Sequence, residues 1–247
     1  MPGDVLLSAD GLSYRYLDRY PALESVSLDV REGETLAVLG ANGSGKSTLL
    51  KVLAGLVFCR AGTLEAFGEQ VSEETLADHA ANARFRSRVG LVFQDPAAQL
   101  FSATVSEDLQ FGCRQLGLDR AETQRRITAV AGMLGIADLL DRSPAHLSLG
   151  QAKRAAIGTV LVMSPHVLLF DEPTAALDPR TTAWLLALLA QLRTSGRTLV
   201  IATHDLELAA ALSDRSIILS EDHQVIAHTA TPRALADQQA LTAANLT

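Results

Sequence analysis

The residues most able to do chemistry form a glycine-rich segment, residues 40–47, which reads Gly-Ala-Asn-Gly-Ser-Gly-Lys-Ser. It fits the pattern Gly-x-x-x-x-Gly-Lys-[Ser/Thr] at every position, and chance produces that pattern on the order of once per 10⁴ to 10⁵ start positions. The backbone N–H groups of such a loop, with the N-terminus of the helix that follows, form a cradle for phosphate. Lys46 would then reach the β- and γ-phosphates, and the Ser47 hydroxyl would bind Mg²⁺. The residues expected to contact the nucleotide are Asn42, Gly43, Ser44, Gly45, Lys46, Ser47 and Thr48.

Two adjacent acids, Asp171 and Glu172, follow an apolar run at residues 167–170. An apolar central strand ends at the carboxyl edge of its sheet, where a phosphate loop on a neighbouring strand would place the metal ion. We expect Asp171 to hold Mg²⁺ through a water molecule. Glu172 would lie near the γ-phosphate and polarise the attacking water as a general base. The pair therefore predicts hydrolysis of a nucleoside triphosphate.

The elements that must position these residues alternate between strands and helices. Runs that are apolar almost throughout predict parallel strands buried on both faces, at residues 36–39, 89–93, 167–170 and 198–202. Helical spacing of apolar residues predicts helices at residues 47–55 and 182–192. Shorter runs predict an antiparallel sheet near the amino terminus, at residues 5–7, 12–16, 25–30 and 63–67. The fold class is therefore α/β, with a mainly parallel core sheet.

The middle of the chain has a different pattern. Strand-like runs vanish between about residues 104 and 147, and residues 121–134 show helical spacing, which predicts a helical subdomain inserted into the sheet domain. The tail after about residue 234 is polar and alanine-rich, so we expect it to fray. The chain is then a single domain, residues 1–247, in which residues 1–101 and 156–247 form the catalytic core with its β-subdomain and residues 102–155 form the helical subdomain.

The composition narrows the function classes. The net charge is -7, from 21 Lys and Arg against 28 Asp and Glu, whereas nucleic-acid binders usually carry a basic excess. No stretch approaches the roughly 18 to 20 continuous apolar residues that cross a bilayer. The two cysteines lie far apart and lack the spacing of a metal or redox motif. We therefore expect no nucleic-acid partner and no membrane span in this chain.

The segment Leu147-Ser148-Leu149-Gly150-Gln151 resembles the signature motif, usually Leu-Ser-Gly-Gly-Gln, of ATP-binding-cassette (ABC) ATPases. The other elements of that family occur in its order along nearly the whole chain. Gln94 follows a strand as the Q-loop glutamine would, residues 176–178 look like the D-loop, and His204 follows a strand as the switch histidine would. The resemblance implies a P-loop NTPase core, an antiparallel N-terminal β-subdomain, an inserted α-helical subdomain, and ATPase activity with ATP and Mg²⁺.

The resemblance also implies roles for single residues. Gln94 would contact Mg²⁺ and the attacking water while coupling to the helical subdomain, and His204 would contact the γ-phosphate. Tyr16 lies where the family has an aromatic residue that stacks on adenine, although Tyr14 and Tyr20 are nearby. The family's remaining nucleotide contacts fall on Ser148, Gly150, Gln151 and Asp178.

A pairing of two chains follows from one phosphate loop and one signature motif. The signature precedes a predicted helix at residues 152–163, whose N-terminus attracts anions. In the family each ATP lies between the phosphate loop of one subunit and the signature of the other, so we expect this chain to pair with a second copy of itself. Leu149 departs from the family glycine. If that position required a positive φ, leucine would cost about 1 to 2 kcal/mol, so we expect ordinary dihedrals and a side chain turned away from phosphate.

The type of cassette is indicated by the region after the strand at residues 89–93. Residues 93–101 and 104–112 resemble the ATPases of energy-coupling-factor importers for cobalt, nickel or vitamins, and the short carboxyl tail fits the cobalt and nickel branch slightly better. Transmembrane subunits would be separate proteins, which places this chain at the cytoplasmic face of the membrane. The alternatives are the ATPase of a vitamin importer or of another ABC transporter, and a soluble cassette that acts on nucleic acid.

Overall fold

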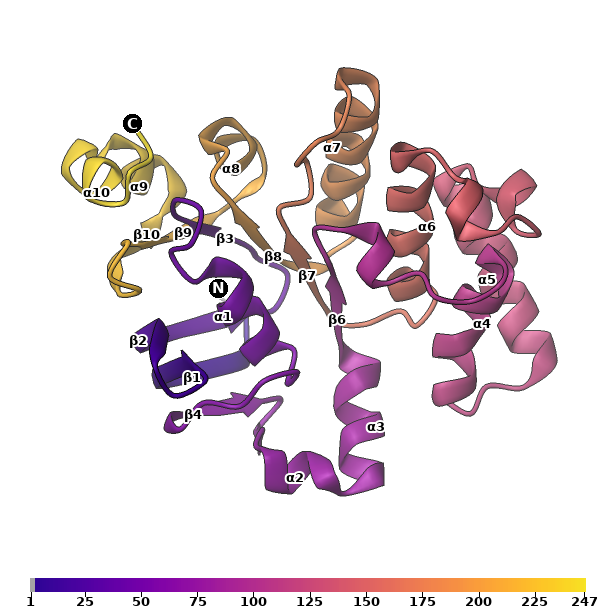
Figure 1. Ribbon diagram of the computed structural model, residues 1–247, viewed down its shortest axis with the longest axis horizontal. Helices are drawn as coiled ribbons and strands as arrows, with labels where there is room; N and C mark the ends of the chain where they lie inside the picture. Colours follow the sequence, from indigo (N-terminus) through magenta and orange to yellow (C-terminus); the bar gives the residue numbers. More distant parts are fainter. Residues whose placement is uncertain (1–2) are drawn as a thin grey trace.

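The computed structural model describes residues 3–247 and contains two β-sheets with helices around them (Figure 1). The smaller sheet is antiparallel, in the order β2-β1-β4-β5, as predicted for the amino-terminal part. Its strands are β1 (Val5–Tyr16), β2 (Tyr20–Arg31), β4 (Ala61–Ala66) and β5 (Glu69–Gln70). The prediction of two separate short strands at residues 5–7 and 12–16 is wrong. β1 continues through Gly11, where a φ of 61° and a shift of register bend the strand without ending it.

The larger sheet has the order β10-β9-β3-β8-β7-β6 and is parallel except between β9 and β10. Its strands are β3 (Thr35–Leu39), β6 (Val89–Val92), β7 (Val167–Asp171), β8 (Thr198–Thr203), β9 (Arg215–Leu219) and β10 (Val225–Ala230). Every residue of β3, β7 and β8 is buried, which explains why these runs are apolar. One expectation is wrong: β7, which ends at the acidic pair, does not neighbour β3. The chain returns from β7 through a helix to β8, and β8 lies between them.

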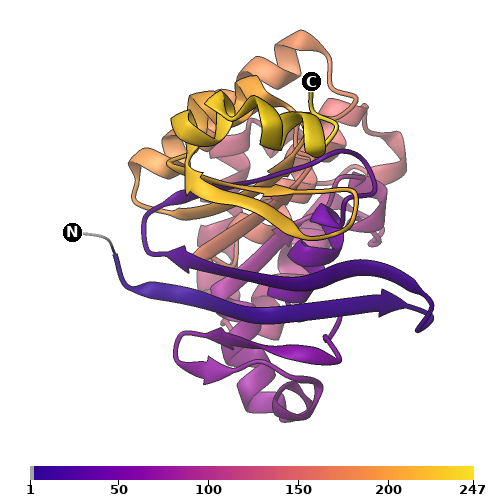
Figure 2. The same cartoon turned by 90° about the vertical axis from the view of Figure 1, so that its left-hand side faces the viewer.

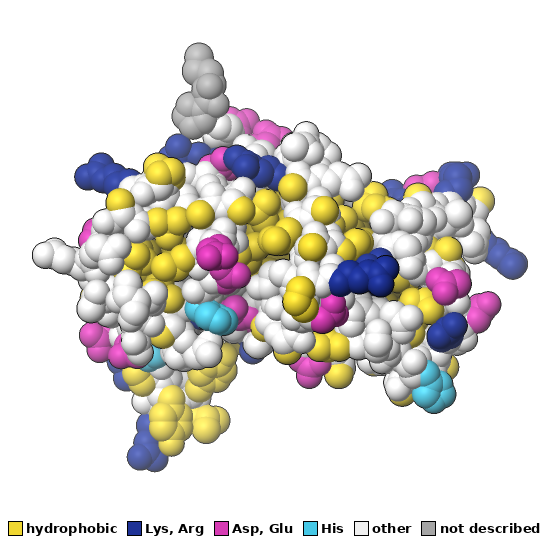
Figure 3. Space-filling model, turned by 90° about the horizontal axis from the view of Figure 1, so that it is seen from above, with side chains coloured by type: hydrophobic (Ala, Val, Ile, Leu, Met, Phe, Trp, Pro, Cys, Tyr) yellow, Lys and Arg dark blue, Asp and Glu magenta, His cyan; other side chains and the backbone are white. Residues whose placement is uncertain are grey.

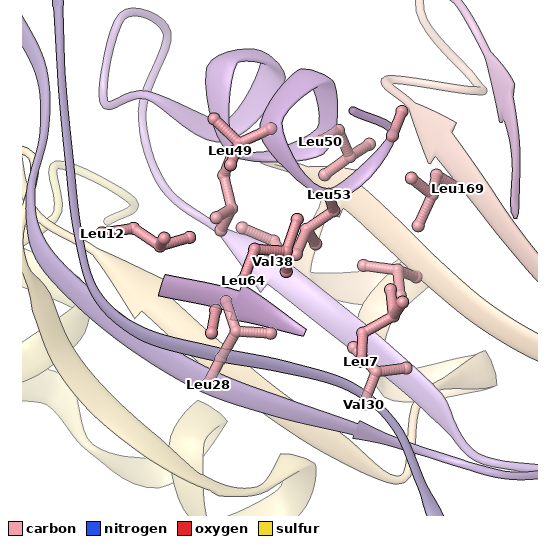
Figure 4. Packing of buried hydrophobic residues seen from close by; sticks show 14 of the residues in the cluster. Leu7, Leu12, Leu28, Val30, Val38, Leu49, Leu50, Leu53, Leu64 and Leu169 are labelled. Carbon is pink, nitrogen blue, oxygen red and sulfur yellow. The ribbon is translucent and has the colours of Figure 1, made fainter. Parts of the chain in front are cut away.

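Two hydrophobic clusters cover opposite faces of the larger sheet. The first joins it to α1 (Lys46–Leu53) and to the smaller sheet, as Figure 4 shows for Leu7, Leu12, Leu28, Val30, Val38, Leu49, Leu50, Leu53, Leu64 and Leu169. The second contains Leu168 and Phe170 of β7, whose neighbours Val167 and Leu169 belong to the first. This alternation follows from the two-residue period of a strand. It places α1 on one face of the sheet and the helices of the second cluster on the other.

The helices of that second cluster are α4 (Val105–Gln115), α5 (Arg120–Leu134), α6 (Leu149–Leu161), α7 (Pro179–Thr194) and α8 (Leu206–Leu212). Of these, α4, α5 and α6 form a lobe beyond β6 (Figure 1). The helix α6 passes through residue 155 without a break, so a boundary at residues 102–155 stays a proposal.

Five short helices were not predicted: α2 (Glu73–Ala77), α3 (His79–Arg88), α8, α9 (Thr231–Ala236) and α10 (Gln238–Ala243). The last two overturn the expectation that the tail frays. They pack over β9 and β10 (Figure 2), and Ala234, Leu241 and Ala244 are buried against β3 and β9. Alanine has no side chain beyond Cβ, so an alanine-rich segment can approach a sheet closely.

The described residues contain no helix that is both long and apolar enough to cross a membrane. On the face of the molecule seen in Figure 3, Lys and Arg side chains lie apart from one another and are interspersed with Asp and Glu.

Candidate active site

The phosphate loop connects β3 to α1. Gly43 and Gly45 have φ values of 89° and 107°, and a Cβ atom on Gly45 would lie 2.1 Å from the carbonyl oxygen of Ala22. Gly45 is also the N-cap of α1 and has no side chain to accept hydrogen bonds from the first turn. The N–H groups of that turn are therefore available to an anion. Within residues 3–247, the buried hydroxyl of Ser44 has no hydrogen-bond partner, which also suits a loop that binds phosphate.

Lys46 lies at the start of α1 and is buried. Its Nζ donates hydrogen bonds to the carbonyl oxygens of Gly40 (2.8 Å) and Ala41 (3.0 Å) and lies 3.1 Å from Oε1 of Glu172. An ammonium group has three donors, and these three acceptors match them. The lysine therefore joins the phosphate loop to the acid predicted to act as general base.

Ser47 of α1 and Asp171 of β7 meet although β3, the strand that leads into α1, is not a neighbour of β7. The Ser47 hydroxyl donates to Oδ1 of Asp171 across 2.8 Å. Burial raises the pKa of Asp171, the Ser47 hydrogen bond opposes that rise, and the charge of Glu172 adds to it. A cation beside this carboxyl would offset the cost of burying its charge. A hydroxyl and a carboxylate are oxygen ligands of the kind that Mg²⁺ prefers, so the two residues fit the expected ion.

Glu172 is the centre of the polar contacts. Its carboxylate lies 3.1 Å and 3.0 Å from Nδ1 of His204, and Thr203 Oγ1 is 3.5 Å from Oε2. The residue follows β7, is 5% exposed, and has a φ of 39°. A non-glycine residue with positive φ costs of order 1 to 3 kcal/mol and persists where the surrounding structure requires it. The backbone turn thus aims this carboxylate at the phosphate loop.

Tyr16 lies at the end of β1, and its hydroxyl is 3.1 Å from Oγ1 of Thr48 on α1. Its ring meets Tyr14 edge to face, with centroids 5.0 Å apart. Tyr14 packs against the first hydrophobic cluster, and burial raises its pKa, whereas Tyr16 is 38% exposed. Of these two aromatic residues, Tyr16 therefore presents the more accessible ring beside the phosphate-loop helix.

The signature motif forms the N-terminus of α6. Ser148 is the N-cap: its Oγ accepts from the Gln151 N–H across 3.3 Å, and its own N–H donates to Oε1 of Gln151 across 3.0 Å. This reciprocal capping box starts the helix at Leu149, so the predicted start at residue 152 is wrong. Leu149 has no positive φ and its side chain is half exposed, in agreement with the expectation of ordinary dihedrals.

Asp178 caps α7 next to the signature. It accepts hydrogen bonds from the N–H groups of Arg180 and Thr181 and, across 2.6 Å, from the Thr181 hydroxyl. The hydrogen bond from the Thr181 hydroxyl, and to a smaller extent those from the N–H groups, lower the pKa of Asp178 below its usual range. A Cβ atom on Gly150 would lie 2.9 Å from Oγ1 of Thr181, so the signature and the D-loop helix touch only because position 150 is glycine.

Gln94 lies in the loop after β6 and its side chain is exposed. The structure therefore brings Lys46, Ser47, Asp171, Glu172 and His204 together, while the Gln94 side chain makes no hydrogen bond among the described residues. Asn42 and Gly43 lie exposed in the phosphate loop.

Two residues of this region were not predicted. Lys153 is buried on α6 and donates to the carbonyl oxygens of Phe93 and Gln94. The side chain of Gln99 links the N–H of Phe93 to α6. A sequence signal for Lys153 did exist, because it precedes Ile157 and Val160 at helical spacing and so lies on the apolar face of its helix.

Comparisons with known proteins agree with this geometry. The family model described as ABC transporter matches residues 23–175. The cobalt import ATP-binding protein CbiO of Rhodobacter capsulatus is 45% identical over 96% of this chain and 82% of its own length, and the nickel import protein NikO of that organism is 45% identical over 81% and 80%.

Solved structures with the same fold include cbiO1 from Clostridium perfringens, described as part of the ABC transporter complex cbiONQ. It has a TM-score of 0.81 and 34% identity, covering 98% of this chain and 95% of that one. The ATP-binding cassette MJ0796, solved as a dimer bound to ADP and Pi, has a TM-score of 0.81 and 27% identity, covering 92% and 99%. The phosphate loop, the buried acidic pair, the capped signature and these matches together show that the chain belongs to the ABC transporter family and is one of its ATP-binding, ATP-hydrolysing subunits.

Proposed function

We propose that this chain is the ATPase of an energy-coupling-factor importer for cobalt or nickel ions. Two relatives carry the names of cobalt and nickel import proteins, and both match it over most of its length. The observation that carries the catalytic part is the contact between Glu172 and both Lys46 and His204. This cluster contains a buried carboxylate, which can activate water, and a lysine, which can bind the phosphates.

Each site residue has a role in this proposal. Glu172 takes the proton of the attacking water as the water approaches the γ-phosphate. The Lys46 ammonium group binds the β- and γ-phosphates. His204 orients the Glu172 carboxylate and donates a hydrogen bond to the γ-phosphate. Ser47 and Asp171 hold Mg²⁺, which when bound neutralises charge on the phosphates. The Tyr16 ring stacks on adenine.

The ATP site is completed by a second copy of the chain. The phosphate loop belongs to α1 and the signature to α6, and these helices pack against opposite faces of β7. This separation by the sheet favours contact of Ser148 and Gly150 with a nucleotide held by another chain. The dimeric structure of a relative bound to ADP and Pi supports a two-fold arrangement in which each signature serves the partner's site. Asp178, which touches the signature through Thr181, would lie at the same interface.

The surface for the membrane subunits is a groove of about 630 Å³ between α3, β6, α4 and α6. Its lining includes Gln99 of the Q-loop and the hydrophobic side chains of Leu56, Phe101, Phe111, Leu116 and Met163. Phe101 and Phe111 are 67% and 46% exposed and meet edge to face, 5.1 Å apart between centroids. Exposed aromatic pairs at the rim of an apolar groove mark sites of protein association. We assign the groove to a cytoplasmic segment of a transmembrane subunit, which places the chain at the cytoplasmic face of the membrane.

Replacing Phe111 by aspartate tests this assignment. We expect the variant to lose copurification with the membrane subunits while the isolated chain keeps its ATP affinity, because the groove lies away from the phosphate loop. Ile226→Asp is the matched control, since Ile226 is also an exposed hydrophobic residue but lies on β10. Equal loss of copurification in both variants would contradict the assignment.

The transported ion is tested in cells that lack this chain. Uptake of radiolabelled cobalt or nickel should fall, and the wild-type chain should restore it while Glu172→Gln should not. Unchanged metal uptake together with impaired vitamin uptake would instead identify the vitamin branch.

A further inference from the structure

The structure holds a lysine in its interior away from the phosphate loop. Lys153 is 1% exposed and is among the largest fully buried side chains of the described residues. Its Nζ donates to the carbonyl oxygen of Phe93 across 3.1 Å and to that of Gln94 across 3.0 Å. A buried ammonium group is costly unless it is hydrogen-bonded. An apolar residue would fill this face of α6 at less cost, so the two carbonyl contacts call for an explanation.

Those carbonyl groups belong to the first two residues of the Q-loop, residues 93–100. Gln99, a residue of the loop itself, also connects the start of the Q-loop to α6. Its Oε1 accepts from the Phe93 N–H across 3.1 Å, and its Nε2 donates to the Ala156 carbonyl oxygen and the Thr159 hydroxyl of α6, both across 2.8 Å. The start of the Q-loop is thus fixed to one helix through its N–H and its carbonyl groups.

The same helix begins at the signature. Ser148 caps α6, and Lys153 follows it by five residues, about one and a half turns. We infer that Lys153 is a positioning residue that fixes the Q-loop glutamine Gln94 relative to Ser148, so that the chain's own ATP site, where Gln94 acts, is coupled to the partner's site, which Ser148 serves. This inference rests on the role that the resemblance to ABC ATPases implies for Gln94, contact with Mg²⁺ and the attacking water.

The electrostatic surroundings agree with a charged group at this place. Burial lowers the pKa of Lys153 to about 8, while the negative charges of Asp171 and then Asp95 oppose that fall. The side chain therefore remains protonated at neutral pH, and its charge lies in the field of the acid expected to hold Mg²⁺. Lys153 therefore has two connections to the site: hydrogen bonds to the Q-loop backbone and a charge interaction with Asp171.

Steady-state ATP turnover by the full chain tests the inference. Lys153→Met keeps the length of the side chain and removes its donors, and we expect kcat to fall about 10-fold, since a misplaced catalytic group costs about that much or more. The KM for ATP should change by less than about twofold, because the phosphate loop and the first turn of α1, which hold the phosphates, lose no contact. Lys153→Arg keeps donors for both carbonyl groups and should retain most of the turnover.

Arg154→Met is the matched control. Arg154 is the next residue of α6, donates to the Leu134 carbonyl oxygen across 3.0 Å and stacks on Trp184, but does not touch the Q-loop. It therefore reports what the loss of a long basic side chain from this helix does through stability alone. We expect near-normal kcat in this variant. A kcat loss in Lys153→Met no larger than that in Arg154→Met would overturn the inference.

A double-mutant cycle with Gln94→Ala shows whether Lys153 acts through the glutamine. If it does, Lys153→Met causes no further loss in the Gln94→Ala background, whereas independent losses that multiply overturn the inference. Normal turnover in Gln94→Ala would overturn the proposed role of Gln94 and this inference with it; a loss there with none in Lys153→Met overturns the inference alone. Should Lys153→Met not fold, Lys153→Arg decides: turnover as low as that of Gln94→Ala is the contradicting result.

Discussion

His204 Nδ1 lies 3.0 Å from Oε2 of Glu172, so the residue that follows β8 contacts the residue that follows β7. The β7 and β8 ladder leads to this contact, because the Glu172 N–H also donates to the Ala202 carbonyl oxygen across 2.9 Å. Two adjacent parallel strands thus bring the proposed base and the histidine proposed to orient it to one edge of the sheet.

Glu172→Gln should slow ATP turnover by about 10² to 10⁴-fold, the usual contribution of a general base. ATP should still bind, because the amide keeps the shape of the side chain and the phosphate loop is unchanged. Turnover and equilibrium nucleotide binding, measured on one preparation, check both points. Glu207→Gln, an exposed acid on α8, is the control and should behave as wild type. Near-normal turnover in Glu172→Gln would refute the assignment of the base.

His204→Ala should lower turnover by roughly 10²-fold, the cost of removing one oriented donor from a site where charge develops. The loss should be smaller than that of Glu172→Gln, because Lys46 still contacts the carboxylate. Comparing kcat for the two single variants measures the difference. A larger loss in His204→Ala would mean that the histidine, rather than the glutamate, accepts the proton.

Leu149→Gly restores the residue that the family usually has at this position of the signature. Because Leu149 has ordinary helical dihedrals, the exchange relieves no strain, and glycine costs a helix about 0.5 to 1 kcal/mol. We therefore expect the free energy of unfolding to fall by about that amount in urea denaturation. A gain in stability would show that leucine is strained there.

The stability of the chain should depend on pH through Lys153. Its pKa is about 8 in the folded chain and 10.5 in the unfolded chain, so between these values the unfolded chain binds a proton that the folded chain lacks. The free energy of unfolding then rises with pH by about 1.4 kcal/mol per unit. Between pH 8 and 9.5, wild type should gain about 2 kcal/mol relative to Lys153→Met, and that stabilisation is lost as the pH falls to 8. Parallel stability curves for the two proteins would contradict this titration.

The sequence predicted most of the elements that carry the site. The phosphate loop and the strands at residues 36–39, 167–170 and 198–202 were recognisable because buried parallel strands are apolar throughout. The strand order was not predictable, because no residue pattern near Asp171 indicates that β8 lies between β7 and β3. The order of the strands depends on where the connection through α7 places β8 in the sheet, which is a property of the tertiary structure.

The errors at the signature and at the tail have local causes. Reading the signature as a loop before its helix missed that Ser148 and Gln151 cap each other, which begins α6 at Leu149. The tail was judged by its polarity, but Ala234 and Ala244 are small enough to pack against the sheet. The roles of Gln94, Tyr16 and Asp178 stay predictions, because they concern groups that meet the nucleotide or the second chain.

We propose that the ATP site is shared between two chains, with the phosphate loop of one and Ser148 and Gly150 of the other. The most direct measurement is the mass in solution of Glu172→Gln with and without ATP and Mg²⁺, by analytical ultracentrifugation. We expect a monomer without nucleotide and a dimer with ATP, because hydrolysis no longer separates the two chains. A variant that binds ATP and remains monomeric at every protein concentration would contradict it.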